Sequence, residues 1–442
     1  MKISVREMTM VKPTDETPRR KLWSSILDVV HPNLHTEIVY FYRSNGDANF
    51  FDTQVLKDAL SRALVAFYPL GGRLKEYQNG RVEVNCQGQG ALFVEAESDG
   101  VIDYFGEFAP TMELRKLIPA VDHSLPIESK PVLILQVTYF KCGGVSLGVG
   151  MFHSVVDAAS MIHFINTWSE MARGLDQITI PPFIDPTLLS ARNPPQPVFE
   201  HVEYKPAYSP SALKSVLLQK APSDETTVSS IFKLTRDQLD SLKVKSKEDG
   251  NTIINYSTFE LLAGHIWKCI CKARGLSDDQ ETKLYFAIDG RARFQPSLPN
   301  GYFGNGALLG TTIPTTVAGE VKSNPSSYAA SKIHDAIVIR DNNYLRSTLD
   351  YLELQPPNMK AVLFGIFQSC NSSNLAISSW AKFPLYDADF GWGRPIFVGL
   401  PWLPVEGIGF VLPSPINDGG LSLFIRLKLE HHKRFTNLFY DI

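Results

Sequence analysis

A histidine stands four residues before an aspartate in the segment His153-Ser154-Val155-Val156-Asp157. An imidazole titrates near neutral pH, so it can take a proton from an alcohol or an amine. The aspartate could orient that imidazole, or it could point away and brace the loop. Spacing alone is equally compatible with a core histidine followed by an aspartate that caps the next helix.

Residues 389–393 form a second segment of note and read Asp-Phe-Gly-Trp-Gly. Gly391 and Gly393 flank a tryptophan, which indicates close backbone approach or a positive φ at these positions. A structural role is favoured over a catalytic one. Arg291 is expected to be an ion partner of Asp389.

The elements around the histidine would hold it firmly. Val132–Phe140 and Val145–Phe152 are rich in β-formers, and the glycine pair 143–144 between them predicts a tight hairpin. His153 then stands at a strand end, where a side chain is exposed but rigidly held. Apolar spacing predicts a helix over Ala158–Arg173.

The rest of the chain repeats this mixture of strands and helices. Between residues 178 and 222 prolines interrupt the pattern, which predicts an extended crossover and a domain boundary. We expect an N-terminal domain over 1–180, a crossover loop over 181–222 and a C-terminal domain over 223–442, with part of 380–405 packing on the first. Further strands are predicted at Val39–Arg43, Val82–Val84, Leu92–Val94, Val228–Leu234, Lys283–Ile288, Ala376–Lys382, Arg394–Gly399 and Leu421–Leu429. Further helices are predicted at Asp52–Phe67, Thr235–Lys247, Ser257–Arg274, Ser327–Arg340 and Arg346–Glu353.

Composition narrows the class of protein. A length of 442 residues exceeds one ordinary core, and 44% hydrophobic with 20% charged residues is typical of a soluble globular protein. A net charge of -3 predicts no footprint for nucleic acids or membranes. The five cysteines are scattered, show no metal-ligand spacing and are expected to be reduced. Without a signal peptide at the N-terminus or a long apolar run, we expect a cytoplasmic protein with no metal.

The two segments together, far apart in the chain, resemble the signature motifs of the plant BAHD acyltransferases. The resemblance extends across the chain and is nearest the branch of hydroxycinnamoyl-CoA:shikimate/quinate hydroxycinnamoyltransferases. It implies an α/β fold of two chloramphenicol-acetyltransferase-like domains, with mixed sheets flanked by helices and a long crossover loop between them. Other segments that carry it are Phe50-Phe51-Asp52, Phe67-Tyr68-Pro69, Tyr302-Phe303-Gly304-Asn305 and Phe439-Tyr440-Asp441-Ile442.

The resemblance also implies a reaction. An acyl-CoA donor passes a p-coumaroyl or caffeoyl group directly to a small-molecule acceptor, with no cofactor besides the CoA thioester, in an enzyme expected to be a monomer. His153 deprotonates the acceptor, and Trp380 matches the tryptophan whose indole N–H serves the oxyanion. Asp157 and Asp389 are mainly structural, and Ser257 is expected to contact CoA.

The acceptor pocket departs from the shikimate-using branch. Ile38 stands where those relatives have a serine, and Phe364 aligns with the arginine that grips the shikimate carboxylate. A phenyl ring offers no bidentate fork to a carboxylate, so we expect an acceptor less polar than shikimate. Thr36, Tyr40 and Ser378 remain as polar contacts. The alternatives are a genuine shikimate or quinate enzyme, a rosmarinic-acid-synthase-like enzyme and an arylamine N-acyltransferase.

Two further departures lie within the first motif. Ser154 and Ala158 stand where relatives usually have a second histidine and a glycine, so two residues of the turn after the base differ from theirs. A non-catalytic relative that keeps the scaffold for binding is therefore an alternative, although the intact histidine, aspartate and tryptophan argue against it. A condensation domain that uses a carrier protein is disfavoured because such domains lack the Asp-Phe-Gly-Trp-Gly segment.

Overall fold

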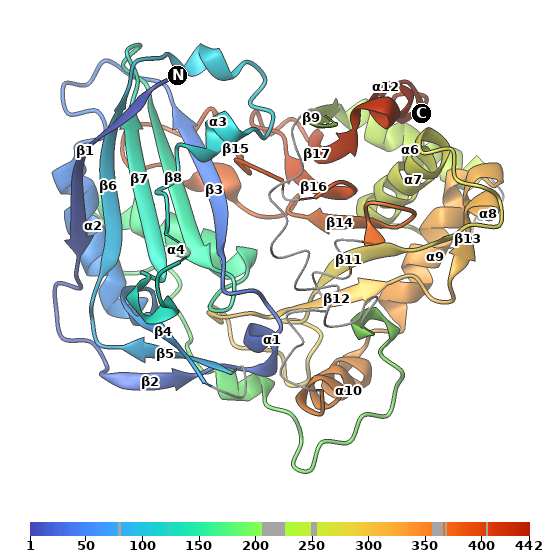
Figure 1. The fold of residues 1–442 in the computed structure, drawn as a ribbon, viewed down its shortest axis with the longest axis horizontal. Helices are drawn as coiled ribbons and strands as arrows, with labels where there is room; N and C mark the ends of the chain where they lie inside the picture. The colour runs from blue at the N-terminus through green and yellow to red at the C-terminus, as the bar shows by residue number, and fades with distance from the viewer. Residues whose placement is uncertain are drawn as a thin grey trace. The chain divides into compact units, whose positions relative to one another are not determined.

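The protein is seen in a computed structural model that spans residues 1–442 (Figure 1). The structure describes residues 1–77, 81–122, 124–205, 226–248, 254–355, 366, 369–403 and 405–442. It divides into two compact units. Unit 1 comprises Met1–Arg192, Pro296–Gly306 and Phe383–Trp402, and unit 2 comprises Asn193–Gln295, Ala307–Lys382 and Leu403–Ile442. Each unit thus combines separate ranges of the chain, and Phe383–Trp402 of unit 1 lies within the range 380–405, part of which was expected to pack on the first domain.

Unit 1 is built on one large mixed sheet. Six of its described strands pair in the order β1-β6-β7-β8-β3-β15. The helices α2 and α4 lie against one face of this sheet (Figure 1), and the Trp168 indole of α4 donates a hydrogen bond to the Leu56 oxygen of α2 over 3.0 Å. Its elements are β1 (Ile3–Val11), β2 (Arg20–Trp23), α1 (Ile26–Val29), β3 (His35–Tyr42), α2 (Thr53–Ala66), β4 (Arg73–Glu76), β5 (Val82–Cys86), β6 (Ala91–Ser98), α3 (Met112–Arg115), β7 (Leu133–Tyr139), β8 (Val145–Phe152), α4 (Ala158–Ala172) and β15 (Phe397–Gly399).

Strands β7, β8 and β3 form the part of the sheet that leads to the motif histidine. β7 and β8 pair antiparallel from Leu133↔Met151 to Tyr139↔Val145, as the predicted hairpin requires. β8 then pairs antiparallel with β3 from His35↔Phe152 to Tyr42↔Val145. All eight residues of β8 are buried, because the strand is central and both of its faces are covered.

Unit 2 also centres on a mixed sheet. Six described strands pair in the order β12-β11-β14-β16-β17-β9, with β11, β14 and β16 mutually parallel. Its elements are β9 (Thr227–Leu234), α6 (Arg236–Glu248), α7 (Thr258–Ala273), β10 (Glu281–Thr282), β11 (Leu284–Asp289), β12 (Ala307–Thr311), β13 (Thr316–Val317), α8 (Ala318–Ser323), α9 (Ser326–Val338), α10 (Asn342–Glu353), β14 (Leu375–Ser379), β16 (Ile408–Pro413), β17 (Leu421–Lys428) and α12 (Leu429–Phe439).

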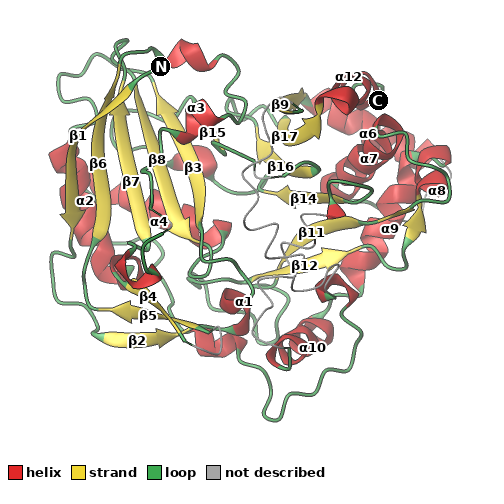
Figure 2. Cartoon of the chain, in the orientation of Figure 1, coloured by secondary structure: helices red, strands yellow, loops and turns green. Residues whose placement is uncertain are grey.

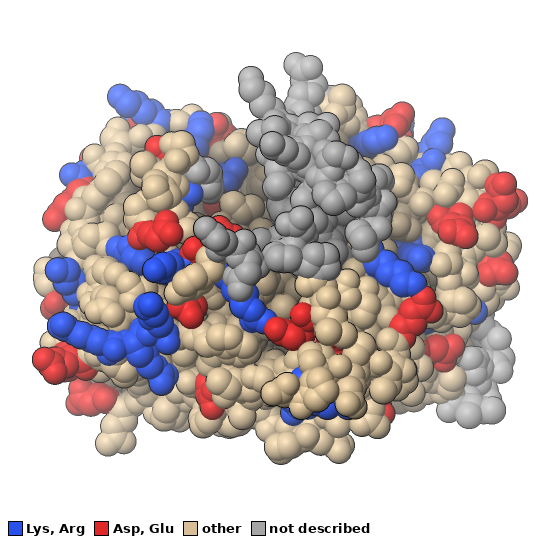
Figure 3. Space-filling view, turned by 60° about the horizontal axis from the view of Figure 1, so that its bottom comes forward, with Lys and Arg blue, Asp and Glu red and all other residues tan. Residues whose placement is uncertain are grey.

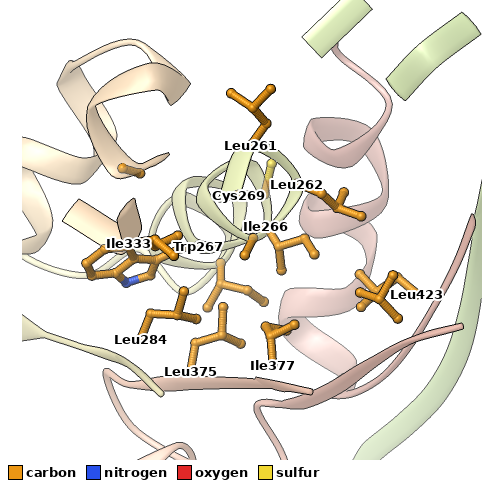
Figure 4. Close-up of a cluster of buried hydrophobic side chains, with 14 of the residues drawn as sticks. Leu261, Leu262, Ile266, Trp267, Cys269, Leu284, Ile333, Leu375, Ile377 and Leu423 are labelled. Atoms are coloured by element: carbon orange, nitrogen blue, oxygen red, sulfur yellow. The ribbon is translucent and has the colours of Figure 1, made fainter. Parts of the chain in front are cut away.

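The core of unit 2 forms where α7 packs on the sheet. Figure 4 shows Leu284, Leu375 and Ile377 from the strands reaching toward Ile266 and Trp267 of the helix, and all five side chains are buried. Burial of large aliphatic side chains contributes about 1.5–3 kcal/mol each, so this cluster is a main source of the unit's stability.

These observations confirm the predicted α/β class, with two sheet-rich units whose strands are flanked by helices (Figure 2). The predicted hairpin and the helix after it are also confirmed, at β7, β8 and α4. Part of the predicted crossover, residues 206–222, lies outside the described residues. The last predicted strand was extended one residue too far, since Leu429 begins α12, a helix that the sequence did not predict.

The surface carries both signs of charge. Figure 3 shows Lys and Arg side chains interspersed with Asp and Glu on the face that it draws. Within the described ranges, no helix is long and apolar enough to cross a membrane. In the same residues no three His, Cys, Asp or Glu side chains gather as metal ligands, and the five cysteines are free thiols.

Candidate active site

His153 is the first residue after β8, and its main chain is held on both sides. Its N–H donates to the Leu34 oxygen over 3.0 Å, which continues the pairing of β8 with β3 for one residue. Its carbonyl oxygen accepts a hydrogen bond of 2.9 Å from the Asn305 side chain. The sequence placed the histidine at a strand end, and the structure shows what immobilises it there.

The imidazole of His153 lies face to face with a second imidazole. The ring centroids of His31 and His153 are 3.8 Å apart and the planes differ by 10°. Burial lowers the pKa of His153, while the charge of Asp157 and the Asn305 side chain act in the opposite direction. The pKa of His31 is held well below its usual value by burial and by His153. Both rings are therefore neutral at neutral pH, which is the form that a general base requires.

Asp157 is the N-cap of α4 and is almost fully buried. One carboxylate oxygen accepts the N–H of Ser160 at 3.0 Å, and the other accepts the N–H of Gly306 at 2.9 Å. The side chain thus ties the start of the helix to the segment around residue 306. Of the two uses that the spacing left open, this geometry favours the brace.

A buried polar network not anticipated from the sequence joins α1 to the histidine. The Asn305 amide donates to Asp28 at 2.7 Å as well as to the His153 carbonyl. Asp28 also accepts the N–H of Ser25, completing a capping box on α1. Burial raises the pKa of Asp28 to about 6, although its hydrogen bonds lower it. The spacing of Ser25 and Asp28 is that of a capping box, but no spacing rule could have joined them to Asn305 and His153, which they meet only through tertiary contacts.

Three of the predicted acceptor residues lie together on β3. Thr36, Ile38 and Tyr40 alternate along the strand and therefore share one face of the sheet. In the register with β8 they pair with residues 151, 149 and 147. His153 follows β8 two residues after position 151, so it continues the series of residues on that face. Ile38 and Tyr40 are fully buried and Thr36 is partly exposed. The expected acceptor residue Phe364 lies outside the described residues.

The Tyr40 hydroxyl is buried, and among the described residues it has no hydrogen-bond partner. Burial raises its pKa far above the usual value, so it remains a neutral phenol. A buried hydroxyl without a partner is costly, by about 1–3 kcal/mol.

The remaining predicted substrate contacts lie in unit 2. Ser378 is partly exposed on β14. Trp380 follows that strand, and its main-chain N–H donates to the Val411 oxygen at 2.7 Å. The Trp380 ring is buried and meets Phe410 edge-on at 5.7 Å. Ser257 is the exposed N-cap of α7, and its hydroxyl accepts the N–H of Glu260.

The Asp-Phe-Gly-Trp-Gly segment belongs to unit 1 and is closed by its own aspartate. One Asp389 carboxylate oxygen accepts the N–H groups of Gly391 at 2.8 Å and Gly393 at 3.0 Å. Both glycines have positive φ, at +107° and +108°, which other residues adopt only with strain. Phe390 is buried against Trp168, with ring centroids 4.7 Å apart. These contacts favour an architectural role.

The predicted partner of this segment has another contact. Arg291 lies in unit 2, where its guanidinium is 3.2 Å from the Asp289 carboxylate. Its pairing with Asp389 stays a prediction.

Residues 1–442, the whole chain, match the Transferase family. The chain belongs to the BAHD acyltransferases. It is 61% identical over 444 residues to the shikimate O-hydroxycinnamoyltransferase of Nicotiana tabacum, with 100% of both chains covered. A hydroxycinnamoyl-CoA:5-hydroxyanthranilate N-hydroxycinnamoyltransferase of Avena sativa is 49% identical over 454 residues, again covering 100% of both.

Among solved structures, vinorine synthase superposes with a TM-score of 0.73 at 22% identity, covering 100% of both chains. This likeness confirms the predicted two-domain, chloramphenicol-acetyltransferase-like fold. The BAHD membership confirms that the protein is an acyltransferase. Enzymes of this family take the acyl group from a CoA thioester.

Proposed function

We propose that this BAHD acyltransferase moves a hydroxycinnamoyl group, p-coumaroyl or caffeoyl, from CoA to a small hydroxyl acceptor by direct general-base catalysis. The observation that carries the proposal is His153, a partly buried imidazole whose pKa is lowered and which is held at the end of β8. The donor class is supported by the two relatives, both of which are named as hydroxycinnamoyltransferases.

In the proposed reaction His153 takes the proton of the acceptor hydroxyl as its oxygen attacks the thioester carbonyl carbon. The negative charge that develops on the carbonyl oxygen would be stabilised by the indole N–H of Trp380. The tetrahedral intermediate then collapses, the carbon–sulfur bond breaks and the CoA thiolate leaves with the proton from the imidazolium. No acyl-enzyme is required, because a thioester is already activated.

The two carboxylates would support this chemistry without joining it. Asp157 would brace the loop after the base, and Asp389 would close its own glycine-flanked turn. Ser257 is proposed to contact CoA at the start of α7, where its hydroxyl also caps the helix.

The acceptor is proposed to be less polar than shikimate. Ile38 is fully buried on the face of β3 that it shares with Thr36 and Tyr40, so this position provides no polar contact. The proposal also depends on the alignment of Phe364 with a carboxylate-binding arginine. Loss of such a contact should weaken the preference for an acceptor with a carboxylate by about a few kcal/mol.

A second candidate is a genuine shikimate or quinate hydroxycinnamoyltransferase. The observation in its favour is the 61% identity to an enzyme named for shikimate. An N-acyltransferase of aromatic amines is the third possibility, because one relative carries that name at 49% identity.

A competition assay separates these candidates. Purified protein is incubated with p-coumaroyl-CoA and a mixture of shikimate, quinate, aromatic alcohols, hydroxyphenyllactate and aromatic amines, with thiol release followed and products identified by mass. We expect the aromatic acceptors to have the highest kcat/KM. Preference for shikimate or quinate over every aromatic acceptor would establish the second candidate. Phe364→Arg is expected to move preference toward acceptors with a carboxylate.

A further inference from the structure

The imidazole rings of His31 and His153 are stacked in van der Waals contact. Their ring centroids are 3.8 Å apart and the planes are within 10° of parallel. His31 follows the C-cap of α1, and its N–H bonds to the Asp28 oxygen at 3.3 Å. Asn305 bonds both Asp28 and the His153 carbonyl. The main chain of His31 is therefore bonded to Asp28, whose side chain belongs to the network that holds the main chain of His153.

We propose that His31 is a positioning residue for the base: its neutral ring holds the plane of the His153 imidazole and stabilises the imidazolium that forms when the acceptor proton is taken. This inference rests on the proposed function, in which His153 is that base.

The geometry supports the first half of the proposal. A flat ring stacked on a second flat ring blocks rotation of the second about its χ2 axis. A base whose ring is already oriented does not lose that freedom during the reaction, and such preorganisation is a recognised contribution to rate. Since both the ring and the main chain of His153 are restrained, the edge of the imidazole that carries its nitrogens points in one direction.

The electrostatics support the second half. The face of a neutral aromatic ring attracts a cation placed over it, and the attraction is larger where water is excluded. His31 provides that face only if it stays uncharged, because two imidazolium rings at this distance would repel each other. Burial and His153 itself keep the pKa of His31 well below the usual value. The pair thus accepts one proton on His153 and not two.

The other titratable groups near the pair do not replace this role. Asp157 favours a proton on His153 through its charge, although both its oxygens bond main-chain N–H groups. Asp28 reaches the pair through Asn305. His35, on β3, stacks on Phe152 with centroids 4.1 Å apart.

The test replaces His31 with residues that separate stacking from volume. His31→Phe keeps an aromatic face, His31→Leu keeps an apolar side chain of similar size, and His31→Ala removes both. For each variant kcat, KM and the pH dependence of kcat/KM are measured with p-coumaroyl-CoA and the best acceptor. His163→Ala is the matched control, since this unit 1 histidine packs edge-on against Phe67 at 5.2 Å and has no part in the site.

We expect His31→Phe to keep kcat within about threefold of wild type, while His31→Leu and His31→Ala lose about tenfold in kcat with little change in KM. In His31→Leu the imidazolium loses its stacked face while the ring stays buried. The acidic limb of kcat/KM should therefore move down by about half a pH unit. His163→Ala should leave the limb in place.

Two results would overturn the inference. If His31→Leu matches wild type in kcat and in its acidic limb, His31 only fills space. If His31→Phe is as poor as His31→Ala, an aromatic face is not what matters. The ring titration of His153, followed by NMR in wild type, His31→Phe and His31→Leu, gives the same comparison without turnover. If no acceptor is turned over, the proposed function is refuted, while the NMR titration still tests the role of His31.

Discussion

Replacing Asp157 tests whether the motif aspartate braces its loop or drives the chemistry. Its two oxygens accept the N–H groups of Ser160 and Gly306 in a buried setting. Hydrogen bonds to a charged group contribute about 1.5–3 kcal/mol each, so Asp157→Ala should lower the free energy of unfolding by about 3–6 kcal/mol. Asp157→Asn keeps one acceptor oxygen and should lose about half of that.

The assay pairs stability with rate. The free energy of unfolding is measured by urea denaturation, and kcat is measured per mole of folded enzyme at the pH optimum. Asp52→Asn is the matched control, because Asp52 caps α2 in unit 1 by accepting the N–H groups of Gln54 and Val55 at 2.8 and 3.2 Å. Asparagine caps a helix about as well as aspartate, and its oxygen can accept both N–H groups, so Asp52→Asn should cost less than the roughly 1 kcal/mol of a lost cap. The Asp157 variants should therefore be destabilised more than this control.

The brace predicts that Asp157→Asn, once folded, keeps kcat within about tenfold of wild type. The reasoning is refuted if Asp157→Asn unfolds like wild type but loses about a thousandfold or more in kcat. That result would mean that the negative charge itself serves the imidazolium, as an orienting carboxylate does in a catalytic triad.

Four further outcomes are expected. His153→Ala should lower kcat by about 10²–10⁴-fold while circular dichroism stays native, and a retained rate would remove it from the base role. Trp380→Phe has no indole N–H and should lose about 10²-fold in kcat with KM little changed, in steady-state kinetics; an unchanged kcat would exclude the oxyanion role. Asp389→Ala removes the acceptor of two exposed glycine N–H groups, to which water can then bond, and should cost about 1–3 kcal/mol in urea denaturation, with kcat of the folded fraction preserved. Asp28→Asn tests the carboxyl whose pKa is raised to about 6: the folded protein holds that proton more tightly than the unfolded chain, so the stabilisation is present in acid and is lost as pH rises through about 6. The free energy of unfolding of wild type minus that of Asp28→Asn should fall by about 2 kcal/mol from pH 4 to pH 7, and a flat difference would contradict the raised pKa.

Local patterns predicted the elements that carry the motif histidine. A β run of eight residues next to a glycine pair could only fold back on its neighbour, and β7 and β8 do so. The aspartate that opened the next helical pattern is indeed an N-cap. In both cases the decisive interactions lie within a few residues of each other, so they can be inferred from spacing.

Other elements depended on distant partners and were missed. β16 contains Gly409 and lies between β14 and β17, and its place is determined by those neighbours more than by its own pattern. α12 is a mainly polar stretch in which Phe435 and Phe439 alone are buried, and their spacing of four residues gave a weak helical pattern. β15, by contrast, was predicted as a strand within Arg394–Gly399, but its pairing with β3 of unit 1 depends on tertiary structure.

The sequence by itself determined the α/β class, the histidine with its strand end, and the family to which the chain belongs. These follow from residue types at short spacing and from two motifs that can be read directly. Only the tertiary structure decided that Asp157 bonds Gly306, that Asn305 links Asp28 to the His153 main chain, and that His31 stacks on the base. The physical reason is that hydrogen bonds and ring contacts act over a few ångströms in space, and the residues that make them can lie at any distance along the chain.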